Sequence, residues 1–282
     1  MRIHHLNCGT MCPLGGRLFY GADRTGDLHR LVCHCLLIET DRDGLVLVDT
    51  GFGLRDVRHP ERLSRLFRLT NGIQLREQET ALRQVERLGF AAGDVRHVVA
   101  THLDFDHAGG LEDFPAATVH VLQAELRQAR EGRHGLVGSN RYSPPQWDGV
   151  TRWREYSPNG ERWFGFESVR NLDGLPPEIL LVPLAGHTLG HTGVVIRTNG
   201  GWLLHAGDAY FHAREMRTSD PGCPPGLRAY QRLMETDRSA RLRNQERLRE
   251  LLREREGEVA ILCSHDAAEL ARYQGRPGHP EP

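Results

Sequence analysis

The chain has 282 residues and no lysine, so all 36 of its basic side chains are arginines. The absence of lysine excludes a lysine nucleophile and a lysine Schiff base. The sequence also has no apolar run near the ~18 residues that a membrane-spanning helix needs. Its first residues, MRIHHLNCGT, lack the charged-then-apolar layout of a signal peptide. We therefore expect a cytoplasmic protein.

The sequence also lacks a strong net charge and the usual cysteine motifs. A formal charge of -1 gives no field that would attract nucleic acid or an anionic membrane, so we expect neither as a partner. The six cysteines include pairs four apart (Cys8, Cys12) and two apart (Cys33, Cys35), and neither spacing is the CxxC of a structural zinc site. We expect reduced, partly buried thiols.

Apolar runs bounded by turn residues predict most of the strands in four parts of the chain, a further strand is expected in TVHVLQAE, and no linker divides the chain. These parts are 34–53, with a turn at Asp41–Gly44, then 94–102, 178–211, with a hairpin through Asn199–Gly201, and 258–266. TVHVLQAE predicts a strand that passes into a helix. Leucines at helical spacing predict amphipathic helices over 60–69 and 75–88, and an Arg/Glu-rich helix is expected over 237–256. We expect one domain over residues 1–282, with a lid or insert at 131–170 and a disordered tail at 275–282.

Polar clusters follow the carboxyl ends of several predicted strands, at 102–107, 187–191, 208–210 and 265–266. Strand ends that face one way are where ligands collect in layered α/β architectures. The first cluster, THLDFDHAGG, places four metal-ligand candidates within six positions. His102 and Asp104 are two apart and project to one side of an extended segment, whereas Asp106 and His107 follow a turn. One short loop could therefore serve two ions.

The other clusters supply the remaining ligands for two ions. We assign His102, Asp104 and His187 to the first ion, Asp106, His107 and His265 to the second, and Asp208 as a shared ligand. Any one of these residues alone is more often a satisfied polar side chain at a strand end. Imidazole and carboxylate ligands suit Zn, Mn or Fe, and we expect two divalent ions, zinc first among them. Such a pair can hold a bridging hydroxide and polarise a scissile bond.

At these residues the chain resembles the metallo-β-lactamase superfamily, whose signature is HxHxDH followed by a distal His, a bridging Asp and a final His. The resemblance implies an α+β fold, a four-layer αββα sandwich, with the metal site at one edge. It also implies that Asp49 and His191 support the ligands from behind. The ending SHD and a Tyr soon after Asp208 are most similar to N-acyl homoserine lactonases.

Two positions depart from that pattern. Asp104 stands where the common signature has His. It could favour Mn or Fe, weaken the first ion, or act as a proton acceptor without ligating. Tyr210 lies two residues past Asp208, whereas the family's Tyr lies three past. Tyr210 is therefore expected either to stabilise an oxyanion or to pack near the site.

The predicted function is a dinuclear metal-dependent hydrolase in which Asp106 passes a proton to the leaving group. Lactone or carboxylic ester hydrolysis is expected first; a thioesterase of the glyoxalase II kind, a phosphodiesterase and a non-catalytic binding module are the alternatives. We expect a small-molecule substrate, and the helix at 60–69 could serve a homodimer interface or face solvent. Five residues are candidates for substrate contact: Met11, Arg141, Tyr142, Trp147 and Trp153. The alternative for Trp147 and Trp153 is that they anchor their loop to the body of the protein.

Overall fold

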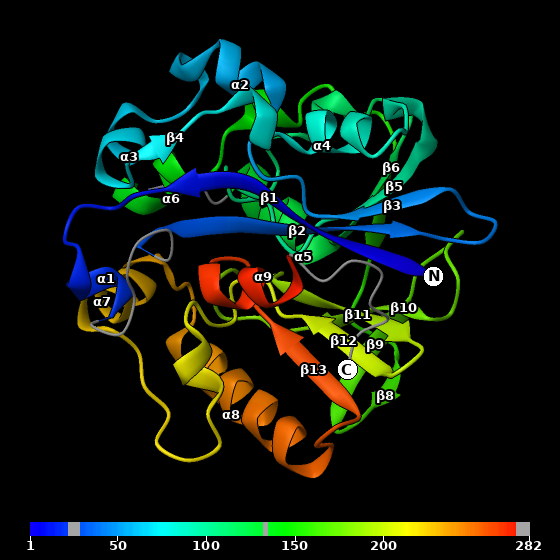
Figure 1. Ribbon diagram of the computed structural model, residues 1–282, viewed down its shortest axis with the longest axis vertical. Coiled ribbons are helices and arrows are strands. Elements are labelled where there is room, and N and C mark those ends of the chain that lie inside the picture. Colours follow the sequence, from blue (N-terminus) through cyan, green and yellow to red (C-terminus); the bar gives the residue numbers. More distant parts are fainter. Residues whose placement is uncertain (22–28, 132–134, 275–282) are drawn as a thin grey trace.

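Two sheets stacked face to face form the centre of the protein, with helices on their outer sides (Figure 1). The structure, a computed structural model, describes residues 1–21, 29–131 and 135–274. The first sheet has the strand order β4 (Ile73–Gln74), β1 (Arg2–Met11), β2 (Leu31–Glu39), β3 (Leu45–Val48), β5 (Val95–Val99), β6 (Thr118–Leu122) and β7 (Trp153–Tyr156). The second has the order β13 (Val259–Leu262), β12 (Gly201–His205), β11 (Thr192–Thr198), β10 (Ile179–Pro183), β9 (Phe166–Asn171) and β8 (Glu161–Trp163).

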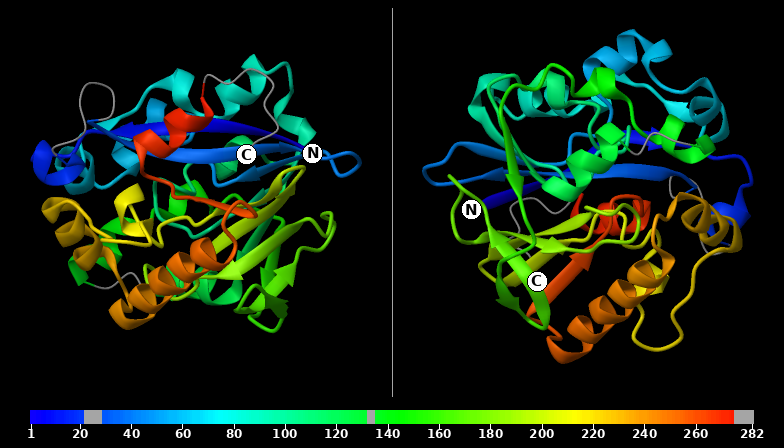
Figure 2. Two further views of the ribbon diagram at one scale, coloured as in Figure 1. Left: turned by 60° about the horizontal axis from the view of Figure 1, so that its bottom comes forward. Right: turned by 180° about the vertical axis from the view of Figure 1, so that it is seen from behind.

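The helices cover the outer faces and the edges of the two sheets (Figure 2). They are α1 (Arg17–Tyr20), α2 (Leu54–Arg58), α3 (Arg65–Thr70), α4 (Ala81–Arg87), α5 (Gln123–Glu131), α6 (Gly135–Arg141), α7 (Pro225–Met234), α8 (Arg238–Glu254) and α9 (Ala267–Tyr273). Short 3-10 helices span Pro60–Arg62, Glu77–Glu79, Ala92–Asp94, Leu111–Asp113, Pro144–Gln146 and Ala213–Met216. The layers confirm the predicted αββα sandwich.

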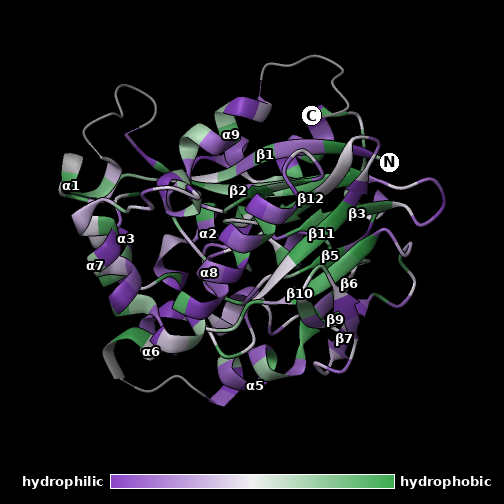
Figure 3. Ribbon diagram, turned by 90° about the horizontal axis from the view of Figure 1, so that it is seen from below, coloured by the Kyte–Doolittle hydropathy of each residue, from purple (hydrophilic) through white to green (hydrophobic). Residues whose placement is uncertain are grey.

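The sandwich follows from strands that are apolar on both faces. In β2, Leu36 and Ile38 project toward the second sheet, while Leu37 projects into the layer under the outer helices. The middle layer joins such residues to Leu181 and Val194 of the second sheet. Hydrophobic residues accordingly run along β5, β6, β10 and β11, whereas α8 is largely hydrophilic (Figure 3).

Parallel pairing brings the candidate site together. β3 pairs in parallel with β5 in the first sheet, and β12 pairs in parallel with β13 in the second. The carboxyl ends of parallel neighbours lie at the same edge of a sheet. Asp49 therefore emerges beside the 102–107 loop, and Asp208 emerges beside His265.

The predicted strands and most predicted helices are confirmed, including the hairpin of β11 and β12, the change from β6 into α5, and α8. The helix expected over 60–69 is instead a 3-10 turn followed by α3, and the one expected over 75–88 is a 3-10 turn followed by the shorter α4. The sequence did not predict β1, α7 or α9. Residues 131–170 are not one long loop, because α6, β7 and β8 lie within them and β9 begins there. β7 and β8 are edge strands of their sheets. The expected disordered tail, 275–282, lies outside the described residues.

Candidate metal centre

Four loops that follow strands bring the predicted metal ligands together. They are 100–110 after β5, 184–191 between β10 and β11, 206–211 after β12 and 263–266 after β13. Close packing fixes the first loop, because a Cβ on Gly109 would lie 2.5 Å from the backbone oxygen of Gly51. All seven predicted ligands lie in these loops and are buried: His102, Asp104, Asp106, His107, His187, Asp208 and His265.

Asp208 lies in the middle of the cluster. Its carboxylate is 3.4 Å from His107 Nε2, 3.1 Å from His265 Nε2 and 3.5 Å from His187 Nε2. Donor atoms close enough to share one ion fall into three groups: His102, Asp104 and His187; His102, His107 and Asp208; and Asp106, His107 and His265.

Hydrogen bonds at Nδ1 fix the tautomers of three of the histidines. His107 Nδ1–H donates to Asp49 Oδ2 at 2.8 Å. His102 Nδ1–H donates to Thr101 Oγ1 at 3.0 Å, because that hydroxyl uses its own proton on Asp49. His265 Nδ1–H donates to a backbone carbonyl of β2 at 2.8 Å. In the neutral imidazole each Nε2 therefore carries a lone pair directed into the cluster, as metal-binding histidines do.

Three buried atoms that could bind a metal ion have no hydrogen-bond partner among the described residues: His102 Nε2, His107 Nε2 and Asp208 Oδ1. Unpartnered buried acceptors are costly unless a cation lies between them. His265 Nε2 faces Asp208 Oδ2 at 3.1 Å, which likewise needs a proton or a metal ion between two acceptors. The second of the three groups, His102, His107 and Asp208, could therefore hold a divalent ion through three protein donors.

Without a metal ion the cluster holds protons instead. Burial alone would lower the pKa of His107, but the carboxylates of Asp208, Asp106 and Asp49 raise it to about 10. Burial also raises the pKa of Asp106, which His107 and His265 oppose. The imidazolium of His107 thus replaces part of the positive charge that an ion would bring, so ion binding must release its proton.

The group expected to hold the first ion is arranged differently. Arg141 Nε and Nη2 donate to the two oxygens of Asp104 at 2.7 and 2.6 Å, and Nη2 also lies 2.9 Å from His187 Nε2. Burial would raise the pKa of the Asp104 carboxyl, but Arg141 and His102 hold it well below its usual range. Asp104 is therefore an ionised partner of a buried guanidinium.

Asp49 supports the site from the end of β3. Its φ of 55° is in the left-handed region, a conformation that costs little for Asp but is uncommon at a strand end. The carboxylate accepts hydrogen bonds from Thr101 N at 2.8 Å and from His107. His191 has a similar role, since Nδ1–H donates to Leu184 O and Nε2 accepts from Asp208 N at 2.8 Å.

Glu125 of α5 is a supporting residue that the sequence did not single out. Its side chain is fully buried and accepts hydrogen bonds from Leu103 N and from the Thr188 hydroxyl. It thus connects the loop after β5 with the loop before β11. Gly190 lies against its backbone, where a Cβ would come within 2.1 Å of Glu125 N. A glutamate at a strand-to-helix junction carries no sequence signal for this role.

The profile of the metallo-beta-lactamase superfamily matches residues 29–265. The chain belongs to this superfamily. A probable metallo-hydrolase of Mycobacterium tuberculosis is 42% identical over 266 residues, which cover 94% of this chain and 80% of that protein. An N-acyl homoserine lactonase of Bacillus cereus is 29% identical over 180 residues, 64% of each of the two chains. An N-acyl homoserine lactone hydrolase with N-hexanoyl-L-homoserine bound at its catalytic metal centre has the same fold, with a TM-score of 0.69 and 21% identity over 96% of this chain and 95% of that one.

The structure does not support the oxyanion role predicted for Tyr210 in this metallo-beta-lactamase site. The side chain is fully buried in the core between the second sheet and α8. Its hydroxyl donates to Glu269 at 3.0 Å. The position two residues past Asp208, rather than three, turns the phenol into the core, which agrees with the packing alternative.

A different tyrosine, Tyr230 of α7, lies beside the cluster, and the sequence did not single it out. Its half-buried ring packs on Phe211 with 6.1 Å between centroids, and Phe211 in turn packs on His265 at 4.8 Å. Burial and the nearby charges of Asp106, Asp104 and Asp208 raise the pKa of Tyr230. Its hydroxyl therefore stays protonated at neutral pH and can donate a hydrogen bond.

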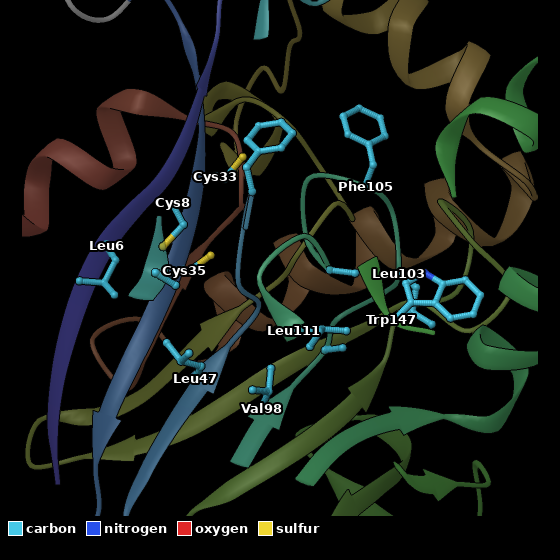
Figure 4. Close-up of a cluster of buried hydrophobic side chains, with 14 of the residues drawn as sticks. Leu6, Cys8, Cys33, Cys35, Leu47, Val98, Leu103, Phe105, Leu111 and Trp147 are labelled. Atoms are coloured by element: carbon cyan, nitrogen blue, oxygen red, sulfur yellow. The ribbon is translucent and has the colours of Figure 1, made fainter. Parts of the chain in front are cut away.

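Several residues proposed for substrate contact belong to the apolar core instead. Met11, Tyr142 and Trp147 are 3%, 4% and 5% exposed and pack in the layer under the outer helices, and Trp153 packs against the same layer. Trp147 lies near Leu103 of the loop after β5 and near Leu111, the first residue of the 3-10 helix that follows this loop (Figure 4). This packing agrees with the anchoring alternative for Trp147 and Trp153, and it places Met11 and Tyr142 in the core as well.

A hollow of about 10 Å³, the size of a single water molecule, lies beside His265 of the candidate site. Its lining residues are Phe19, Tyr20, Arg30, Leu31, Phe211, His212, Leu227, His265, Asp266 and Ala267. Most of these side chains are apolar. A larger hollow around the β2–β3 turn, at Arg42 and Arg96, adjoins none of the predicted ligands.

Proposed function

We propose that this metallo-hydrolase opens lactone rings or cleaves carboxylic esters. One observation carries the proposal: the buried, unpartnered donors His102 Nε2, His107 Nε2 and Asp208 Oδ1 form a group that could hold one ion. The N-acyl homoserine lactonases among the relatives favour a lactone as substrate.

A divalent ion bound in this group supplies a Lewis acid and lowers the pKa of a water ligand toward neutrality. Asp106 lies 3.6 Å from His265 and 3.9 Å from His107, and burial raises the pKa of its carboxyl. It is therefore suited to accept a proton and return it to the leaving alkoxide. Tyr230 can donate its hydroxyl proton to the oxyanion that develops from the carbonyl. Phe211 holds Tyr230 next to the histidines.

Zinc as the metal, a cytoplasmic location and a homodimer stay predictions, and the expected number of two ions is taken up below. His and Asp donors suit Zn, Mn and Fe alike. No helix among the described residues is long and apolar enough to cross a membrane. Leu66 and Leu69 of α3 are 45% and 65% exposed, so this helix has an apolar surface available for a partner copy.

The test is hydrolysis of a panel of substrates by the purified protein before and after chelation. We expect chelator-sensitive opening of an N-acyl homoserine lactone, and no comparable rate with a thioester or a phosphodiester. His107→Ala should abolish the activity, whereas His97→Ala, which changes a half-buried histidine paired with His120, should retain it. Faster cleavage of the thioester or phosphodiester would assign a different substrate class. Full activity in His107→Ala would overturn the proposed site.

A further inference from the structure

The Arg141 guanidinium bonds to Asp104 and contacts His187, two of the ligands that the sequence assigns to the first metal ion. We propose that its guanidinium replaces that ion, so that the chain binds one divalent ion at His102, His107 and Asp208. This inference rests on the proposed metal-dependent hydrolysis and specifies how many ions support it. The supporting observation is the double contact of Arg141 with Asp104, at 2.7 and 2.6 Å, together with its contact with His187.

His187 has no free lone pair at Nε2 for a metal ion. If Nε2 carries the ring proton, it donates to Asp104 Oδ2 at 3.0 Å. If Nε2 is unprotonated, its single lone pair accepts from Arg141 Nη2 at 2.9 Å. In both tautomers the atom is already engaged, in contrast to His102 Nε2 and His107 Nε2. A metal ion at the usual ~2.0–2.1 Å from this nitrogen would have to displace the guanidinium.

Further hydrogen bonds and burial fix the position of Arg141. Arg141 Nη1 donates to the backbone oxygen of Met234, the last residue of α7, at 2.9 Å. The Arg141 carbonyl accepts a hydrogen bond from Phe105 N at 2.9 Å, so the arginine backbone is fastened to the ligand loop itself. The side chain is only 3% exposed. An arginine is always charged, and its planar fork matches a carboxylate in the bidentate geometry seen here.

This arrangement explains why position 104 holds Asp where the common superfamily signature has His. A histidine could ligate an ion but could not accept two hydrogen bonds from a guanidinium. An aspartate pairs with the guanidinium and cancels its charge within the buried site.

The test is metal stoichiometry, measured by elemental analysis after dialysis against excess Zn²⁺ or Co²⁺. We expect one ion per chain in the unmodified protein. Arg141→Met frees Asp104 and His187 to act as metal ligands and should raise the number of ions to two per chain. Arg241→Met is the matched control, since Arg241 is also buried and pairs with a carboxylate, Glu235, at 2.7 Å, and it should leave the value at one.

A second test measures the number of ions per chain in His187→Ala, and it does not depend on whether Arg141→Met folds. The variant should retain one ion, because His187 is not a ligand of that ion. Two ions in the unmodified protein, falling to one in His187→Ala, would overturn the inference, as would a value of one in folded Arg141→Met. Chelator-sensitive hydrolysis with two ions would leave the proposed function intact. One ion without hydrolysis would refute the function alone, and no ion would refute both.

Discussion

At the scale of single residues, the partner of each imidazole Nδ1 decides what Nε2 can bind. His102, His107 and His265 each donate from Nδ1 to an oxygen and leave Nε2 directed into the cluster. His187 differs because its Nε2 already contacts Arg141 and Asp104. Histidines that are equivalent in the sequence motif are therefore not equivalent as ligands.

Metal affinity should rise with pH between about 7 and 10. The pKa of His107 in the metal-free protein is about 10, so its Nε2 must lose a proton before it can bind an ion. Because the imidazolium predominates below that pKa, each pH unit should tighten binding by about tenfold for one released proton. Competition with a chelator of known affinity for Co²⁺, measured at several pH values, checks this slope. An affinity that does not change with pH would contradict it.

Tyr230→Phe should lower kcat by about tenfold or more, because it removes a donor to the developing oxyanion. Metal content should not change, since the proposed ligands of the ion are His102, His107 and Asp208. Tyr210→Phe is the matched control: its hydroxyl bonds to Glu269 in the core, so it should affect stability and leave kcat near that of the unmodified protein. The reverse result, a loss of kcat only in Tyr210→Phe, would restore the role predicted from the sequence.

At the scale of elements, α9 carries a buried acid that links stability to pH. Burial and the nearby Asp266 raise the pKa of Glu269 to about 8, against an ordinary value of 4.5. The folded protein therefore holds the proton more tightly than the unfolded chain does. The protonated Glu269 carboxyl therefore adds to the free energy of unfolding. This contribution is complete below about pH 4.5 and is lost as the pH rises to about 8.

Glu269→Gln should remove this pH dependence. Over that window the unmodified protein should lose stability relative to the variant, at no more than about 1.4 kcal/mol per pH unit. Urea unfolding at pH 5, 6.5 and 8 measures the difference, with Glu246→Gln as a control at an exposed glutamate. Parallel stability profiles for Glu269→Gln and the unmodified protein would contradict the assignment.

Elements with a steady hydrophobic pattern could be predicted from the sequence, and others could not. β2, β3, β5 and β11 are apolar runs that need both faces covered, so their pattern is local. β1 reads RIHHLNCGTM, and its strand conformation comes from pairing with β2, which no local pattern encodes. The ligand loop was predictable because its residues are adjacent. The partnership of Asp104 with Arg141 joins residues 37 positions apart and emerges only in the folded chain.

At the scale of the whole molecule, the two halves of the sandwich meet at the candidate metal centre. His102 and His107 follow a strand of the first sheet, whereas Asp208 and His265 follow strands of the second. An ion bound by both sets should stabilise the folded protein, because the unfolded chain cannot present them together.

Saturating Zn²⁺ should therefore raise the Tm of the chelated protein by several degrees. An ion at 100 times its Kd contributes about 2.7 kcal/mol to folding. Calorimetry or circular dichroism can follow the transition, and His107→Ala should abolish the increase. An equal increase in that variant would indicate that zinc binds elsewhere.

The measurement that tests the central claim most directly is recovery of lactone hydrolysis when Zn²⁺ is added stepwise to the chelated protein. We predict that the chelated protein is inactive and that activity returns as the ion binds, but not in Asp208→Ala, which lacks the central carboxylate of the cluster. Full activity of the metal-free protein, or equal recovery in Asp208→Ala, would contradict the claim that an ion at this centre supports the hydrolysis.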